Sequence, residues 1–171
     1  SSTPDWYGSK LFVSPINGYI YIGTDRIKVY TSTGAWVVTI GDGTSAGNNL
    51  SGRSAGLSYA YGSNILVDNS GSIYAHNGYY FFRKYSSTWS FLYSVGSLGW
   101  WPWDNDLSYN SARIDYSFLW DIDSSNNLYL ADYGNYKIKK YSSTGTWMMT
   151  IGSNVWYYYA NTLSWTWADI I

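Results

Sequence analysis

A segment of 55 or 56 residues occurs three times in this chain, and this repeat constrains the fold more than any other feature. Its best-preserved part reads YTSTGAW at 30–36, YSSTWSF at 85–91 and YSSTGTW at 141–147. A glycine follows five residues after the aromatic residue that ends each of these segments. Chance does not keep so many positions in register over three copies, so the chain is a repeat protein.

Within each copy, polar and apolar residues alternate over short runs that end at clusters of Gly, Asn and Ser. Such alternation between turn residues predicts β-strands joined by tight hairpins. We therefore predict three four-stranded antiparallel meanders, which is the strand number of propeller blades or of a related β-array. The first strands align as 11–13, 66–68 and 121–123, and the second strands align as 20–22, 73–75 and 128–130.

The third copy resembles an NHL repeat through the ADYGN segment at 131–135 and through Ile138. The second copy has AHNG at 75–78 in the corresponding place, and the first copy is shortened there to GTDR at 23–26. The resemblance covers the three blade cores, more than half of the chain, and omits the linkers. It implies a β-propeller fold, since NHL repeats generally build six-bladed propellers that bind proteins, nucleic acids or other ligands, and a minority are lyases. It supports a fold better than an activity, because one fold hosts many functions.

The repeat divides the chain, 1–171, into blade cores and linkers within a single repeat domain. Ordinary propellers close with four to eight blades. We therefore expect an all-β, β-propeller-like fold of NHL type that is completed by self-association. The blade cores are expected at 10–41, 64–96 and 118–152, with linkers at 42–63, 97–117 and 153–171.

Composition narrows the class of protein. Charged residues make up 12% of the chain and the net charge is −1, so no basic field is present to attract nucleic acid. No apolar run reaches the length of a membrane span, and the absence of cysteine excludes disulfides and thiol chemistry. Low charge with many Ser, Thr, Asn, Gly and Tyr residues favours an extracellular or cell-surface location. Asn49, in the only Asn-x-Ser/Thr sequence, is a candidate glycosylation site.

Aromatic residues that do not repeat are concentrated in the linkers, and they are the candidate ligand-contacting side chains. Aromatic faces suit sugar rings, proline-rich peptides or another subunit, although the same residues can simply cap the blade array. Asp104 and Asp106 offer oxygens to calcium but lack the rest of a calcium loop, so a solvated turn is the better interpretation. The candidates are Trp100, Trp101, Trp103, Trp156, Tyr157, Tyr158 and Tyr159.

The two ends of the chain lie at nearly the same phase of the repeat, because 163–171 resembles 57–66. Three blades would leave two open sheet edges, and unpaired edges favour pairing with another strand. Two copies in a ring, many copies in a fibre, or blades elsewhere on a longer polypeptide would each satisfy these edges. We predict self-association through edges formed by Trp6, Leu11, Phe12, Val13, Trp165, Trp167, Ile170 and Ile171.

Few residues are suited to catalysis. His76 is the only histidine, so a metal cluster built on His and Cys is excluded. A triad of His76 with Asp68 is formally available, but an exposed turn histidine is the better interpretation. Aspartates recur at strand ends and turns, where they accept hydrogen bonds from backbone N–H groups, so a structural role is favoured over a glycosidase-like pair. The aspartates concerned are Asp68, Asp121, Asp123 and Asp132. We predict no catalytic residue, no metal and no cofactor.

Two further sets of residues repeat with the blades. A basic residue lies two positions before each tyrosine of the repeat, where it either faces a carboxylate on the neighbouring strand or covers an exposed face. An aromatic residue recurs at the start of each fourth strand, where packing between sheets is expected. The two sets are Lys28, Arg83 and Lys139, and Trp36, Phe91 and Trp147.

The sequence therefore predicts a non-enzymatic, extracellular structural protein whose copies associate through open sheet edges into a fibre or a ring. The alternative is a carbohydrate-binding module whose linker aromatics stack on sugars. Neither a nucleic-acid partner nor a membrane span is expected.

Overall fold

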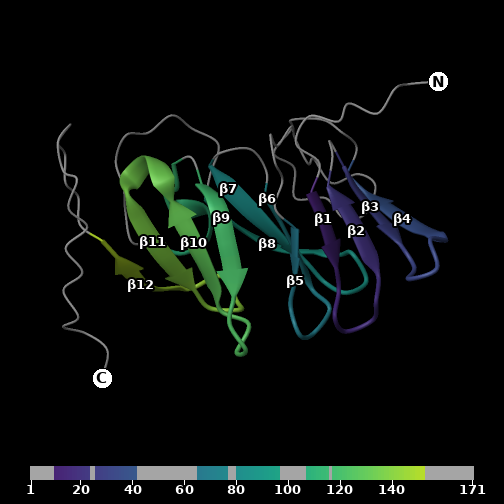
Figure 1. Ribbon diagram of the computed structural model, residues 1–171. Helices are drawn as coiled ribbons and strands as arrows, with labels where there is room; N and C mark the ends of the chain where they lie inside the picture. Colours follow the sequence, from purple (N-terminus) through teal and green to yellow (C-terminus); the bar gives the residue numbers. More distant parts are fainter. Residues whose placement is uncertain are drawn as a thin grey trace.

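The computed structural model describes residues 10–23, 26–41, 65–76, 80–96, 107–115 and 117–152. They form three separate four-stranded sheets, which we name blades 1 to 3 in chain order (Figure 1). Blade 1 contains β1 (Lys10–Val13), β2 (Ile20–Gly23), β3 (Ile27–Tyr30) and β4 (Trp36–Ile40). Blade 2 contains β5 (Ile65–Val67), β6 (Ile73–His76), β7 (Phe81–Tyr85) and β8 (Phe91–Gly96). Blade 3 contains β9 (Ser117–Ile122), β10 (Leu128–Asp132), β11 (Lys137–Tyr141) and β12 (Trp147–Ile151).

Each blade is an antiparallel meander in which every strand pairs with its neighbour in sequence. This confirms the predicted all-β fold of three four-stranded repeats. Two short 3₁₀ turns complete the described structure, η2 (Tyr109–Ser111) before blade 3 and η3 (Tyr133–Asn135) between β10 and β11. Within the described residues, no helix has the length and apolar character needed to cross a membrane.

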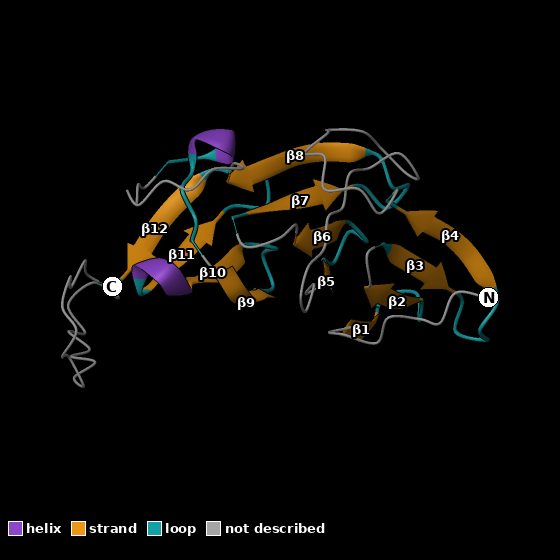
Figure 2. Cartoon of the chain, turned by 90° about the horizontal axis from the view of Figure 1, so that it is seen from above, coloured by secondary structure: helices purple, strands orange, loops and turns teal. Residues whose placement is uncertain are grey.

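The blades lie side by side in chain order and together form an arc. Seen from above, the first strands β1, β5 and β9 lie on the inner side of the arc, and the last strands β4, β8 and β12 follow its outer side (Figure 2). Neighbouring blades therefore meet through sheet faces. We call the face toward the next blade in sequence the forward face, and the face toward the preceding blade the backward face.

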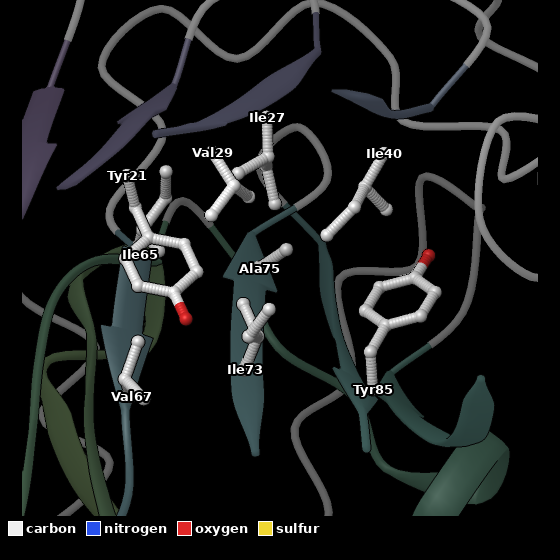
Figure 3. Close-up of a cluster of buried hydrophobic side chains, with 9 residues drawn as sticks. All are labelled: Tyr21, Ile27, Val29, Ile40, Ile65, Val67, Ile73, Ala75 and Tyr85. Atoms are coloured by element: carbon white, nitrogen blue, oxygen red, sulfur yellow. The ribbon is translucent and has the colours of Figure 1, made fainter. Parts of the chain in front are cut away.

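Two apolar cores hold the array together, one at each junction between blades. In the first core, side chains from the forward face of blade 1 meet side chains from the backward face of blade 2 (Figure 3). The second core joins blade 2 to blade 3 in the same way and includes Ala112 and Ile114 from the segment before blade 3. Blade 2 is covered on both faces, so all five residues of β7 are buried. The first core consists of Tyr21, Ile27, Val29, Ile40, Ile65, Val67, Ile73, Ala75 and Tyr85.

The cross-strand register corrects the alignment of the first strands. Leu11 is opposite Ile22 in blade 1, Ile65 is opposite the equivalent Ala75 in blade 2, and Trp120 occupies the same position in blade 3. The sequence alignment had therefore placed the first strands of blades 2 and 3 one residue too late. The turn after β1 is closed by a hydrogen bond between residues five apart, whereas the equivalent turns span four. This shift matters because one residue moves a side chain to the opposite face of its strand.

The hairpin between the third and fourth strands has the same geometry in all three blades. In blade 3, the Gly145 amide donates to the Ser142 carbonyl at 2.9 Å, and the Gly34 amide of blade 1 makes the equivalent bond at 3.0 Å. These glycines have φ values of 87° and 84°, a left-handed conformation in which a Cβ is unfavourable. Trp89 takes this position in blade 2 with φ 65°, and its ring packs against the first core.

We expect Gly145→Ala to destabilise the protein more than Gly34→Ala. Both substitutions put alanine in the left-handed region, which costs about 1–2 kcal/mol. A Cβ at Gly34 has no neighbour within 4 Å, whereas a Cβ at Gly145 would lie 2.7 Å from the ring of Tyr93 in blade 2. The overlap adds about 1–3 kcal/mol, measurable by urea unfolding of both variants. Equal losses would mean that the hairpin of blade 3 moves away from Tyr93 without cost.

Candidate functional site

A buried ion pair links blade 2 to blade 3. Lys84 Nζ on β7 lies 2.9 Å from Asp68 Oδ2 at the end of β5, and both side chains are almost fully buried. The same ammonium group donates to the Ser143 carbonyl of blade 3 at 3.0 Å and lies 4.7 Å from the centre of the Tyr74 ring. The hydroxyl of Tyr93 donates to the Ser143 carbonyl at 2.9 Å. This carbonyl therefore receives both an ammonium and a phenol from the preceding blade.

The environment of this pair favours its charged form. Burial alone would raise the pKa of Asp68, but the hydrogen bonds from Ser70, Lys84 and Ser72 outweigh burial and lower the pKa. Burial would lower the pKa of Lys84, but its interactions with Tyr74 and Asp68 outweigh burial and raise the pKa. Both shifts stabilise the ion pair at neutral pH.

Blade 3 repeats this cluster on its forward face. Lys140 Nζ lies 3.4 Å from Asp123 Oδ2 and 4.8 Å from the centre of the Tyr129 ring, close to the spacing found in blade 2. Hydrogen bonds, first of all from the Asn127 side chain, lower the pKa of Asp123 to about 2. Asp123 and Lys140 are partly exposed, unlike their equivalents in blade 2.

Blade 1 has neutral residues in the same two places. Ser14 replaces the aspartate and Val29 replaces the lysine, and both are buried. The junction between blades 1 and 2 therefore lacks this ion pair, and Val29 belongs to its apolar core.

Two of the turn aspartates, Asp68 and Asp123, accept hydrogen bonds from backbone N–H groups, as predicted. Asp68 Oδ1 accepts hydrogen bonds from the backbone amides of Ser70 and Ser72 at 3.0 and 2.9 Å. Asp123 does the same with the amides two and four residues later, at 3.0 and 2.8 Å. Each carboxylate thus closes the first hairpin of its blade with one oxygen and faces a lysine with the other.

A second buried ion pair lies on the backward face of blade 3. Lys139 Nζ is 3.2 Å from Asp132 Oδ2, and neither side chain is exposed. Lys139 also donates to the Arg113 carbonyl at 2.7 Å, and Asp132 accepts from the Asp115 amide at 2.7 Å and from the Asn135 side chain. The pair thereby fastens the segment before blade 3 to the sheet. Of the two roles that the sequence left open for the repeated basic residues, Lys139 has the first, because it faces a carboxylate on the neighbouring strand β10.

The backward face of blade 1 and the forward face of blade 3 are not covered by any described blade, and we call them the outer faces. On blade 1, Leu11 and Val13 are 65% and 53% exposed, whereas their equivalents Ile65 and Val67 in blade 2 are 4% exposed. Tyr30 is partly exposed, although the equivalent Tyr85 is fully buried. The outer face of blade 1 is formed by Leu11, Val13, Ile20, Ile22, Lys28, Tyr30, Trp36 and Thr39.

The outer face of blade 3 shows the same loss of burial. Ile151 is 38% exposed, whereas Ile40 and Val95 at the equivalent positions are fully buried. Tyr129 is partly exposed, although the equivalent Tyr74 is fully buried. This outer face is formed by Asp121, Tyr129, Ile138, Lys140, Met149 and Ile151. Both ends of the array thus present residues of the kind that its internal junctions bury.

Trp36 corrects one sequence interpretation. Residues 36, 91 and 147 were expected to share one core position, and Phe91 and Trp147 do pack against the two cores. Trp36 is instead 60% exposed, because it lies on the outer face of blade 1. Lys28 is exposed for the same reason, although Arg83 and Lys139 at the equivalent positions are buried.

The structure describes three of the residues that were predicted to form the association edges. Every blade, including the middle one, is a separate sheet that ends in two edge strands, so edges do not distinguish the ends of the array. Of the predicted edge residues, Leu11 and Val13 lie on the outer face of blade 1, and Phe12 points to the opposite side and packs against the first core. The others lie outside the described residues, namely Trp6, Trp165, Trp167, Ile170 and Ile171.

The remaining predicted sites fall largely outside the described residues. This applies to the glycosylation candidate Asn49 and to every linker aromatic proposed to contact a ligand. His76 is the last residue of β6, but its side chain is outside the description. Within the described residues, no group of three or more His, Cys, Asp or Glu side chains is placed to hold a metal ion. The linker aromatics are Trp100, Trp101, Trp103, Trp156, Tyr157, Tyr158 and Tyr159.

Comparison with known proteins supports the fold. No family model and no curated protein matches the chain. The solved structure of streptogramin B lyase matches 85% of this chain and 41% of its own, with a TM-score of 0.55 and 18% sequence identity. A crystal structure of a protein of unknown function from Bacteroides caccae matches 78% of this chain and 41% of its own, with a TM-score of 0.42 and 9% identity. The chain therefore spans less than half the length of either structure.

The three face-packed meanders and the match to streptogramin B lyase define the chain as all-β and β-propeller-like. At 18% identity this likeness establishes the fold alone. The name of that neighbour includes an enzymatic activity, which belongs to that protein.

Proposed function

We propose that this chain is a non-enzymatic structural module whose copies associate through the two outer faces of the blade array. The observation that carries the proposal is the contrast in burial between equivalent positions. Side chains that are buried at both internal junctions become exposed only where a blade has no described neighbour. Exposed apolar residues gathered on one sheet face mark an interaction surface more strongly than the same residues scattered singly.

The shape of the array favours a closed particle. Because the blades follow an arc, adding further blades in the same sense continues a curve instead of a straight stack (Figure 2). A contact that joins two different faces closes into a ring when its rotation brings the ends together, and otherwise forms a filament. We therefore favour a ring of two or more copies over a fibre.

The proposal extends to family and location. Membership of the NHL family is supported by the ADYGN segment, in which Asp132 and Asn135 hydrogen-bond to each other beside the buried Lys139. A structural role is supported by Asp68, Asp123 and Asp132, each of which pairs with a lysine. The extracellular location is supported by the composition and the sequence around Asn49, and mass spectrometry of the native protein would test glycosylation there.

The proposal predicts that the purified chain forms particles larger than its monomer mass of 19.4 kDa. Light scattering over a concentration series would measure the particle mass, and electron microscopy would distinguish rings from fibres.

Trp36 gives a second signal, because an exposed indole that becomes buried emits at shorter wavelength. The difference in emission between the wild type and Trp36→Phe should shift to the blue as the concentration rises. A monomer with unchanged Trp36 emission at every concentration would contradict the proposal.

A further inference from the structure

The junction between blades 2 and 3 provides a template for a junction between copies. Its polar contacts join the forward face and the first turn of blade 2 to two turns of blade 3. Lys84 reaches the Ser143 carbonyl in the hairpin between β11 and β12 at 3.0 Å. In the hairpin between β9 and β10, Asn126 accepts a hydrogen bond from the Asn69 amide at 3.0 Å. The forward face and the first turn of blade 2 therefore supply donors, and the turns of the following blade supply acceptors.

The outer face of blade 3 repeats the donor side of this template. Lys140 has the same two neighbours as Lys84, a carboxylate and a tyrosine ring, at nearly the same distances. Ile138 and Ile151 take the positions of Phe82 and Val95, which are buried between blades 2 and 3. The outer face of blade 3 therefore has the kinds of residue with which blade 2 binds blade 3.

The outer face of blade 1 repeats the acceptor side. Ser32 occupies the position of Ser143, in a hairpin closed by the same pair of backbone hydrogen bonds. The Thr31 amide donates to the Ala35 carbonyl at 2.8 Å, as the Ser142 amide does to the Thr146 carbonyl. Ile20 and Tyr30 correspond to Leu128 and Tyr141, which complete the second core. The Ser32 carbonyl is thus placed as an acceptor for a lysine from a preceding blade.

The positions of donor and acceptor select between the ways in which two copies can meet. Two blade 3 outer faces would leave each Lys140 without the acceptor that Lys84 has, because that acceptor is a turn carbonyl of the following blade. Two blade 1 outer faces would have no lysine at the position of Lys140, because that position lies on the forward face of a blade, where blade 1 has the buried Val29. Only the unlike pair of faces combines the lysine of one copy with the acceptor turn of the other.

We propose that the partner of this chain is a second copy bound head to tail, with the outer face of blade 3 on the outer face of blade 1 and Lys140 donating to the Ser32 carbonyl. This inference rests on the proposed self-association and specifies its faces and register. The junction reproduces the contact between blades 2 and 3, so the array continues across the boundary between copies with unchanged blade packing.

Two variants that each disable one face test the head-to-tail arrangement. Leu11→Glu with Val13→Glu disables only the blade 1 face, and Met149→Glu with Ile151→Glu disables only the blade 3 face. All four side chains are exposed, so the folds should persist, which circular dichroism and thermal melting would verify. Each variant alone should be monomeric in analytical ultracentrifugation, and an equimolar mixture should give a one-to-one dimer through its remaining intact pair of faces. Leu92→Glu, at an exposed position of the middle blade, is the control and should assemble like the wild type.

The outcomes separate this inference from the proposed function. If the wild type assembles but one face variant alone still forms dimers, like faces meet, and the head-to-tail arrangement is wrong while self-association stands. If the wild type is monomeric, both proposals fail.

Lys140→Met tests the polar contact and should weaken assembly by roughly tenfold or more, as expected when a charged hydrogen bond is lost. Unchanged assembly of Lys140→Met would overturn the role assigned to this lysine.

Discussion

Lys84→Val is expected to lower the free energy of unfolding by about 3–5 kcal/mol, because it leaves Asp68 buried without its counter-ion. Removing one partner of a buried ion pair costs more than the pair contributes, since the remaining charge keeps its desolvation penalty. The Ser143 carbonyl loses its ammonium donor as well, although Tyr93 still donates to it. Urea unfolding followed by circular dichroism would measure the loss.

Blade 1 provides a natural reference for this experiment. Its equivalent site contains Ser14 and Val29, both buried and uncharged. We therefore expect the double variant Asp68→Ser with Lys84→Val to be more stable than Lys84→Val alone, because no isolated charge remains. A double variant less stable than the single one would show that the ion pair is needed for packing in blade 2, in contrast to blade 1.

Lys139→Met is the second substitution with a large expected effect, again about 3–5 kcal/mol at neutral pH. It leaves Asp132 fully buried beside an apolar side chain and removes the bond to the Arg113 carbonyl. The segment before blade 3 is tied to the sheet through these groups, so loss of the pair should also loosen that segment. Lys28→Met is the matched control, because Lys28 takes the equivalent position in blade 1 and is exposed. Its stability should change by less than about 0.5 kcal/mol.

The effect of Lys139→Met should depend on pH with a definite sign. In the wild type, burial raises the pKa of Asp132 above 3.8. Lys139 and the hydrogen bonds lower this pKa, but burial has the larger effect. Without Lys139, the pKa should rise further, so the folded variant binds a proton more tightly than the unfolded chain. The loss in free energy of unfolding is then largest when the pH is above the pKa of Asp132 in the folded variant. It becomes smaller as the pH falls toward 3.8. A penalty that is constant between neutral and mildly acidic pH would mean that the unpaired carboxylate is not the cause.

The sequence was sufficient to predict the repeat, the strands and the hairpins, because each depends on local patterns. Tight turns need residues such as Gly34 and Gly145, and half-buried strands need alternation. It was not sufficient to predict the phase of the first strands, since the extra residue in the turn after β1 leaves no compositional mark. It also could not show that Trp36 and Trp147 differ in exposure, because exposure depends on whether another blade covers the face.

The ion pairs between turns and third strands were missed, although they left a signal. Asp68 precedes Lys84 by 16 residues and Asp123 precedes Lys140 by 17, so opposite charges recur at one phase of the repeat. The signal was obscured because blade 1 has Ser14 and Val29 there, and because the basic residues one position earlier matched in all three copies. Those earlier residues lie on the opposite face of the strand, where Lys139 pairs with Asp132.

The order of strands in each meander determines how this fold can gain or lose repeats. Every strand pairs only with its neighbours within the same blade, and every described blade packs only against the next one. A duplicated or deleted repeat of this kind would preserve the hydrogen bonding of all other blades and would require one junction to be rebuilt. Genes for such arrays can therefore lengthen or shorten in whole repeats, and the number of blades can vary while each blade keeps its structure.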